Sequence, residues 1–137
     1  MKNIIKNIIS ISISLIDNLM IIFISRINSE EYDLLVKVDA IGDFIVWLPY
    51  AWHYLEFNKN KKTILICNES LKEVAEKINL FDQLIYINTF KFKRNIFYRY
   101  KILLIMKSYK FNNAIQTTFS RDFLVGDSLI KFSSANK

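Results

Sequence analysis

Polar residues divide the chain into two parts at a joint over residues 28–31. Before the joint, five polar side chains recur at spacings of four, three, four and three positions: Asn3, Asn7, Ser10, Ser14 and Asp17. Isoleucine and leucine fill most of the positions between them. Because an α-helix repeats about every 3.6 residues, this pattern predicts an amphipathic helix within residues 1–28.

Four interpretations of this first segment remain open. Asp17 and Asn18 interrupt its apolar core and Arg26 follows, which disfavours a secretory signal peptide. A charged residue near the centre also makes a membrane-spanning helix marginal. The polar stripe suits a helix that lies in the membrane interface with Lys2, Lys6 and Arg26 toward the lipid head groups, and we favour this membrane-associating helix. A helix packed on its own domain or on a partner chain is the fourth interpretation.

After the joint, short β-rich runs alternate with helical stretches. The predicted strands are 33–38, 63–67, 83–87 and 113–117, and the predicted helices are 44–57, 69–78, 92–109 and 121–132. This alternation predicts an α/β fold with a parallel sheet and helices on both of its faces, a Rossmann-like domain over residues 32–137. The first two strands are continuous apolar runs, as expected for parallel strands that are covered on both faces.

The chain ends directly after the last predicted helix, where a further strand is expected in a domain of this kind. We therefore interpret the domain as truncated from a longer protein.

Composition narrows the chemistry. With 52% apolar and 23% charged residues among 137, the chain is not intrinsically disordered. It has a single cysteine, Cys67, and a single histidine, His53, which excludes an internal disulfide and a cysteine-based zinc site. Any reaction must therefore depend on carboxylates, hydroxyls and backbone groups, and we expect neither a cofactor nor a metal.

The net charge of +6 is unevenly distributed. The segment from Gln83 to Arg121 contains eight lysines and arginines and no aspartate or glutamate. Such a segment favours an anionic partner: a phosphorylated glycolipid, an acidic membrane surface or a nucleic acid. Residues 90–110 also carry many aromatic side chains, a mixture that can bind single-stranded nucleic acid. We favour a solvated or membrane-facing basic helix and expect no nucleic acid, because four residues fit a buried helical face: Ile96, Tyr100, Leu103 and Leu104.

Candidate chemistry lies in the loop after the first strand, because ligands of open parallel sheets bind at the carboxyl ends of the strands. Asp39, Gly42 and Asp43 lie in this loop. Gly42 lacks a Cβ and so permits a positive φ or the close approach of a ligand. Asp43 precedes the predicted helix, where it either caps the helix or faces the cleft as a general base.

The loop resembles the N-terminal signature of the heptosyltransferase family, glycosyltransferase family nine. The residues that match are Asp39, Ile41, Gly42, Asp43, Leu48 and Pro49. A second, supporting match is the fourth strand with the loop that carries Ser120 and Arg121, followed by Asp127 and Leu129. The resemblance covers residues 32–137.

The resemblance implies the N-terminal half of a GT-B glycosyltransferase, which binds the acceptor, while a second domain, absent here, binds the nucleotide-sugar donor. It implies sugar transfer to lipopolysaccharide or another cell-surface saccharide, with Asp43 as the catalytic base. Asp39, Gly42, Ser120 and Arg121 become candidates for holding an anionic lipid-linked acceptor, with Asp39 supporting the loop. The expected location is cytoplasmic, peripheral on the inner face of the cell membrane.

Without a donor domain, we expect the chain alone to be inactive. The alternative function is that of a non-catalytic, membrane-associated binding remnant of such an enzyme. A membrane-tethered basic adaptor is a third hypothesis.

Overall fold

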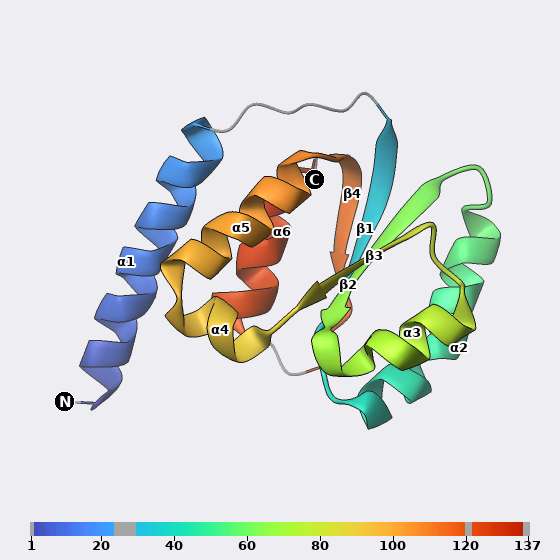
Figure 1. Cartoon of the computed structure of the whole chain (residues 1–137), viewed down its shortest axis with the longest axis horizontal. Helices are drawn as coiled ribbons and strands as arrows, with labels where there is room; N and C mark the ends of the chain where they lie inside the picture. Colours follow the sequence, from blue (N-terminus) through green and yellow to red (C-terminus); the bar gives the residue numbers. More distant parts are fainter. Residues whose placement is uncertain (1, 24–29, 120–121, 136–137) are drawn as a thin grey trace.

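Four strands form one sheet in the computed structural model, which describes residues 2–23, 30–119 and 122–135 (Figure 1). The strands are β1 (Glu31–Lys37), β2 (Lys62–Asn68), β3 (Gln83–Ile87) and β4 (Lys110–Gln116). They run parallel in the order β3-β2-β1-β4. The predicted α/β fold with a parallel sheet is confirmed, and this architecture is consistent with a Rossmann-like domain.

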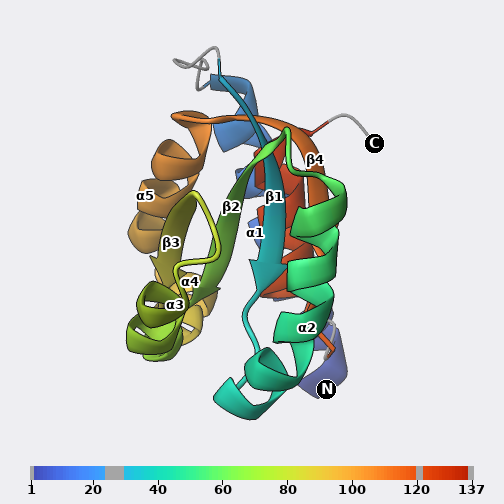
Figure 2. The same ribbon diagram turned by 90° about the vertical axis from the view of Figure 1, so that its right-hand side faces the viewer.

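Helices cover both faces of the sheet (Figure 2). One face carries α2 (Ile41–Phe57), the short 3₁₀-helix η1 (Glu69–Leu71) and α3 (Lys72–Ile78). The other face carries α4 (Thr89–Arg94), α5 (Ile96–Lys107), the π-helical turn η2 (Phe123–Asp127) and α6 (Ser128–Ser133). The helices change face where the chain returns from β3 to β4, as right-handed crossover connections require when the direction along the sheet reverses.

The central strand β1 is buried on both faces. Leu34 and Val36 are fully buried against the α4–α6 side, and Leu35 is buried against α2 and α3. On β2 the pattern is the same, since Leu35 aligns with the fully buried Leu65, whereas Ile115, its partner on the edge strand β4, is exposed. The continuous apolar run that predicted a doubly covered strand is thereby explained.

Several predicted boundaries are wrong. The helix predicted over residues 92–109 is two helices, because Asn95 has an extended backbone (φ −115°, ψ 110°) and caps α5 by accepting a hydrogen bond from the Tyr98 backbone N–H at 3.0 Å. The helix after β1 begins at Ile41, not Phe44, so Gly42 and Asp43 lie in its first turn. The described part of the predicted 121–132 helix starts as a π-helical turn.

Helix α1 (Lys2–Phe23) packs on α5, α6 and η2 (Figure 1), and Met20 and Ile21 are among the residues that face the core. Asp17 is buried there, and the Ser14 hydroxyl accepts a hydrogen bond from Lys131 Nζ at 3.0 Å. Packing on the domain was one of the four interpretations of this segment. No helix within residues 2–23, 30–119 or 122–135 combines the length and apolar character needed to cross a membrane.

Arg99 of α5 is the partner of Asp17, and both side chains are almost fully buried. All five guanidinium N–H groups have acceptors: two bonds go to the Asp17 carboxylate, two to the carbonyls of Phe92 and Leu124, and one to the Ser128 hydroxyl. Arg99 and Lys107, which is also buried, therefore do not belong to the predicted basic surface.

The face of α5 that faces the core also differs from the prediction. Ile102, Leu103 and Met106 are buried against the sheet, whereas Ile96, Tyr100 and Leu104 are exposed. Of the four residues predicted to share a buried face, only Leu103 does so, because the ion pair of Arg99 fixes the rotation of the helix.

Candidate functional site

The strand order places a crevice between the carboxyl ends of β1 and β4. From β1 the chain builds β2 and β3 on one side, and it then adds β4 on the opposite side of β1. In open parallel sheets, ligands bind where the order reverses in this way. The loops after β1 and β4, both singled out from the sequence, meet at this point.

A buried ion pair joins these two loops. Lys37, the last residue of β1, has its Nζ 2.5 Å from Asp39 Oδ2, and the side chains are only 3% and 6% exposed. Lys37 Nζ also donates to the Thr117 carbonyl at 3.2 Å, and Asp39 Oδ2 accepts from the backbone N–H of Phe119 at 3.0 Å. Asp39 therefore holds the β4 loop against the β1 loop.

Asp43 has a different environment. It is the third residue of α2, its side chain is exposed, and it has no hydrogen bond or ion pair within the described part of the chain. The N-cap of α2 is Ala40, and no side chain bonds to the first turn. The alternative in which Asp43 caps the helix is therefore wrong, although its place in the first turn still suits a negative charge.

A hollow of about 250 Å³ lies beside Asp43. Its lining residues come from the ends of β1 and β4 and from α2: Lys37, Asp43, Val46, Trp47, Tyr50, Thr117 and Phe119. The Trp47 ring stacks on Phe81 with centroids 6.1 Å apart, and Lys37 Nζ lies 5.9 Å from the Trp47 ring centroid. One wall of the hollow is thus a fixed aromatic ring beside a buried cation.

Gly42 does not adopt a positive φ, which corrects one of its two predicted uses. A Cβ at this position would meet no atom within 4 Å. The first turn of α2 therefore presents bare backbone next to Asp43, and the close approach of a ligand remains as the use of this glycine.

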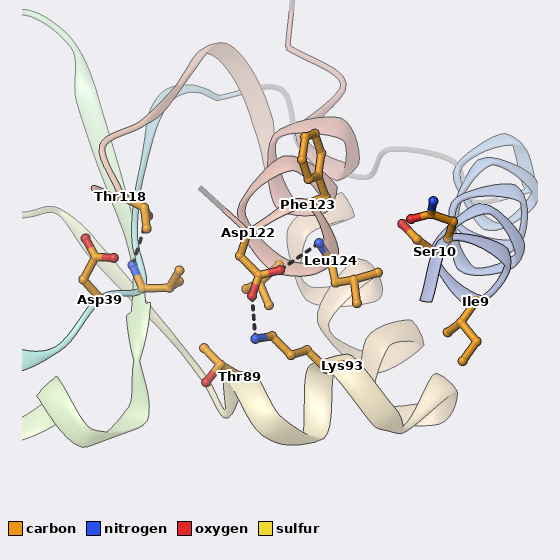
Figure 3. Close-up of a pocket in the computed structure, with 12 residues that line it drawn as sticks. Ile9, Ser10, Asp39, Thr89, Lys93, Thr118, Asp122, Phe123 and Leu124 are labelled. Atoms are coloured by element: carbon orange, nitrogen blue, oxygen red, sulfur yellow. Dashed lines mark hydrogen bonds and ion pairs between the residues drawn. The ribbon is translucent and has the colours of Figure 1, made fainter. Parts of the chain in front are cut away.

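A larger cavity of about 620 Å³ lies on the opposite face of the sheet (Figure 3). Asp39 and Thr118 border it from the sheet, while Ile9 and Ser10 border it from α1. The Asp122 carboxylate forms an ion pair with Lys93 Nζ at 2.5 Å and accepts a hydrogen bond from the Leu124 backbone N–H at 3.0 Å (Figure 3). These contacts hold together one wall of the cavity.

Sequence reasoning missed two of the cations near these hollows. Lys37 is a charged residue at the end of an apolar strand, which is the signal that could have identified it. Lys93 was assigned only to the general basic segment. Ser120 and Arg121, the other two predicted acceptor-binding residues, lie outside the described residues.

No three His, Cys, Asp or Glu side chains within the described ranges lie close enough to hold a metal ion. Burial raises the pKa of the Cys67 thiol to about 12, so this cysteine is not an activated nucleophile.

Comparison with protein-family models, with curated proteins and with solved structures finds no match to this chain.

Proposed function

We propose that the chain is the acceptor-binding half of a heptosyltransferase-like glycosyltransferase of the GT-B type, with Asp43 as its catalytic base. One observation carries the proposal: the Asp43 carboxylate is exposed, is unpaired within the described residues, and borders a hollow at the switch point of a parallel sheet. A carboxylate without a structural partner can accept a proton without disrupting the fold.

In the proposed reaction, an acceptor sugar hydroxyl attacks the anomeric carbon of a nucleotide-activated sugar. Asp43 takes the hydroxyl proton, the new glycosidic C–O bond forms, and the bond from the anomeric carbon to the diphosphate oxygen breaks. The nucleoside diphosphate leaves with the electrons of that bond. A positioned base contributes roughly 10²- to 10⁴-fold to such a step.

The lining of the hollow suits a saccharide. Trp47, Tyr50 and Phe119 offer ring faces, whose partial negative charge attracts the C–H groups of a sugar. The bare backbone at Gly42, next to Asp43, allows a sugar to approach closely. In this proposal Asp39 acts by positioning the β4 loop.

The remaining parts of the proposal come from the resemblance. Ser120 and Arg121 hold the anionic group of a lipid-linked acceptor, which is lipopolysaccharide or another cell-surface saccharide. A second domain holds the nucleotide-sugar donor. The site then works at the inner, cytoplasmic face of the cell membrane, to which the chain attaches peripherally.

Sugar transfer tests the role of Asp43. In a chain joined to a donor domain, Asp43→Asn is expected to lower kcat by about 10²- to 10⁴-fold, because an amide cannot take the proton. Glu56→Gln, which removes an exposed carboxylate elsewhere on α2, is the matched control and keeps full activity. Near-normal turnover of Asp43→Asn would show that the carboxylate is not the base.

Acceptor binding can be measured on the chain itself. In a Trp52→Phe background Trp47 is the only tryptophan, so its fluorescence reports on the hollow. A phosphorylated oligosaccharide is expected to change this fluorescence saturably, and Tyr50→Ala is expected to weaken the effect. The absence of saturable binding would overturn the acceptor site, including the alternative of a non-catalytic binding remnant.

A further inference from the structure

Helix α1 packs on the domain through a mixed side, in which the apolar side chains of Met20 and Ile21 lie beside the buried Asp17. Asp17 lies on the inner side and is buried, and Ser14 accepts its hydrogen bond from Lys131 of α6. Amphipathic helices of globular proteins normally bury most of their apolar residues. In α1, several apolar residues on the outward side have no partner within the described residues.

The outward side of α1 is a continuous apolar stripe. Six of its members are 56% to 75% exposed and recur at helical spacing: Ile4, Ile8, Ile11, Leu15, Leu19 and Ile22. The helix has 22 residues, so the stripe is about 30 Å long. Monomeric soluble proteins rarely expose an apolar patch of this length, and such patches mark protein or membrane contacts.

The helices α4 and α5, on the same face of the sheet as α1, also expose aromatic and cationic side chains. Phe97 and Lys101 are exposed and lie on the side of α5 opposite to the residues buried against the sheet. On α4, the guanidinium of Arg94 lies 4.2 Å from the centroid of the exposed Phe90 ring. Aromatic rings and lysine or arginine beside an apolar stripe are typical of surfaces that lie at the boundary of lipid head groups and acyl chains.

The side of the molecule that carries α1 has fewer acidic residues than the opposite side. On this side, α1, α4, α5, α6 and η2 contain two acidic residues: Asp17, which is buried against Arg99, and Asp127 of η2. In contrast, η1, α2 and α3 on the other face of the sheet carry five: Asp43, Glu56, Glu69, Glu73 and Glu76. The surface around α1 is therefore both apolar and cationic.

We propose that the outward side of α1, with the exposed aromatic and cationic side chains of α4 and α5, is a docking surface for an anionic lipid bilayer. The helix lies in the plane of the interface. Charge complementarity selects this occupant over a second copy of the chain, because a symmetric contact through α1 brings two cationic surfaces together, whereas an anionic bilayer neutralises them.

This docking surface provides a structural basis for the peripheral membrane location in the proposed function. It rests on the proposed function only for the identity of the membrane. Ile9 and Ser10 of α1 also border the 620 Å³ cavity, so this cavity, on the face of the sheet opposite to Asp43, lies next to the docking surface.

Sedimentation of the full chain with vesicles tests the docking surface. Binding to vesicles of phosphatidylcholine and phosphatidylglycerol is expected to be much stronger than binding to phosphatidylcholine alone. Ile8→Ser with Leu15→Ser is expected to lower the partition coefficient at least about tenfold, because two apolar side chains no longer enter the acyl region. The matched control, Ile45→Ser with Phe57→Ser, removes exposed apolar side chains from α2 and leaves binding unchanged.

Two further variants separate charge from apolar contact. Arg94→Gln and Lys101→Gln are each expected to lower binding to anionic vesicles about fivefold and to leave binding to neutral vesicles unchanged. In Leu15→Cys, a fluorophore attached at the new thiol is expected to shift to shorter wavelength with vesicles, while the buried Cys67 stays unlabelled.

Circular dichroism and thermal melting establish that each variant is folded, which is expected because every changed side chain is exposed. Unchanged vesicle binding by a folded Ile8→Ser, Leu15→Ser variant would overturn the proposal. The proposal would also be overturned if the parent chain forms a dimer and this variant is monomeric, because the stripe would then be the contact between two copies of the chain. Asp43→Asn is expected to bind vesicles normally, so failure of the transfer experiment leaves this inference standing.

Discussion

The Asp17 carboxylate and the Arg99 guanidinium, 82 residues apart in the chain, form an ion pair in which neither side chain reaches solvent appreciably. Asp17 is the only acidic residue of α1, and Arg99 is held by carbonyls of α4 and η2 as well. The pair therefore fixes both the position of α1 on the domain and its rotation. Together with the hydrogen bond from Lys131 to Ser14, it leaves the apolar stripe pointing outward.

Breaking this pair is expected to destabilise the domain strongly. Arg99→Met leaves the Asp17 carboxylate buried without a partner, which costs about 3–5 kcal/mol in the free energy of unfolding measured with urea. Lys62→Met is the control, because its ion pair with Glu30 is about half exposed and contributes little. Asp17→Leu with Arg99→Met is expected to recover part of the loss, since no unpaired charge remains. Equal effects of Arg99→Met and Lys62→Met would contradict the structural role of the pair.

The two aspartates of the β1 loop are expected to behave differently in hydrogen exchange. Asp39→Ala removes the acceptor of the Phe119 backbone N–H, so this amide is expected to exchange faster with deuterated solvent. Asp43→Ala removes a side chain with no hydrogen bond in the described structure and is expected to leave the Phe119 amide protected. Equal protection of Phe119 in the two variants would show that Asp39 does not connect the loops.

The two glycines are expected to respond in opposite directions to alanine. Gly42→Ala places a Cβ in open space within a helix, so the free energy of unfolding rises by about 0.5–1 kcal/mol. The same variant is expected to weaken acceptor binding in the Trp47 fluorescence titration, because the Cβ fills the approach to the backbone. Gly126→Ala forces its Cβ into the side-chain amide of Gln116 and lowers the melting temperature. A Gly42→Ala variant with unchanged acceptor affinity would remove Gly42 from the site.

Stability is expected to fall in alkaline solution. Burial raises the pKa of Cys67 to about 12, and burial with the hydrogen bond to Glu76 raises the pKa of Tyr86 to about 12. Burial with the hydrogen bond to Asp33 also raises the pKa of Tyr54. The unfolded chain releases these protons near their ordinary pKa values, about 8.5 for cysteine and about 10 for tyrosine, whereas the folded chain retains them. The folded state then binds more protons, so the free energy of unfolding decreases as pH rises from about 8.5 toward 12.

Urea unfolding at a series of pH values between 7.5 and 11 measures this dependence. Cys67→Ala is expected to reduce the slope at the lower end of the range, where only the thiol of the unfolded chain titrates. A free energy of unfolding that stays constant up to pH 11 would contradict the burial of these three groups.

Local patterns predicted the sheet because its strands are short and apolar. The apolar run Leu34, Leu35 and Val36 predicted a strand that is covered on both faces, and in the structure all three side chains are buried. The break at Asn95 was missed because the residues on both sides of it favour a helix, and the cap became evident only in the backbone. The rotation of α5 was also missed, since it depends on a partner 82 residues away.

The candidate site was accessible from the sequence only in part. Asp39 and Asp43 were singled out as neighbours in a loop, but nothing in that loop distinguishes the buried carboxylate from the exposed one. Their separate environments arise from Lys37 and from Phe119, which lies 80 residues beyond Asp39. Pairings over such distances depend on the tertiary fold and leave no periodic signal.

The addition of β4 beside β1 has a consequence for biosynthesis. Until β4 leaves the ribosome, the side of β1 that will pair with it is an open sheet edge, and this edge carries Leu34 to Val36. The two strand ends are about 80 residues apart, which at about 5–20 residues per second corresponds to roughly 4–16 s of synthesis. During that interval the nascent chain exposes an apolar edge that can pair with other chains, so slow translation or arrest within this stretch promotes aggregation.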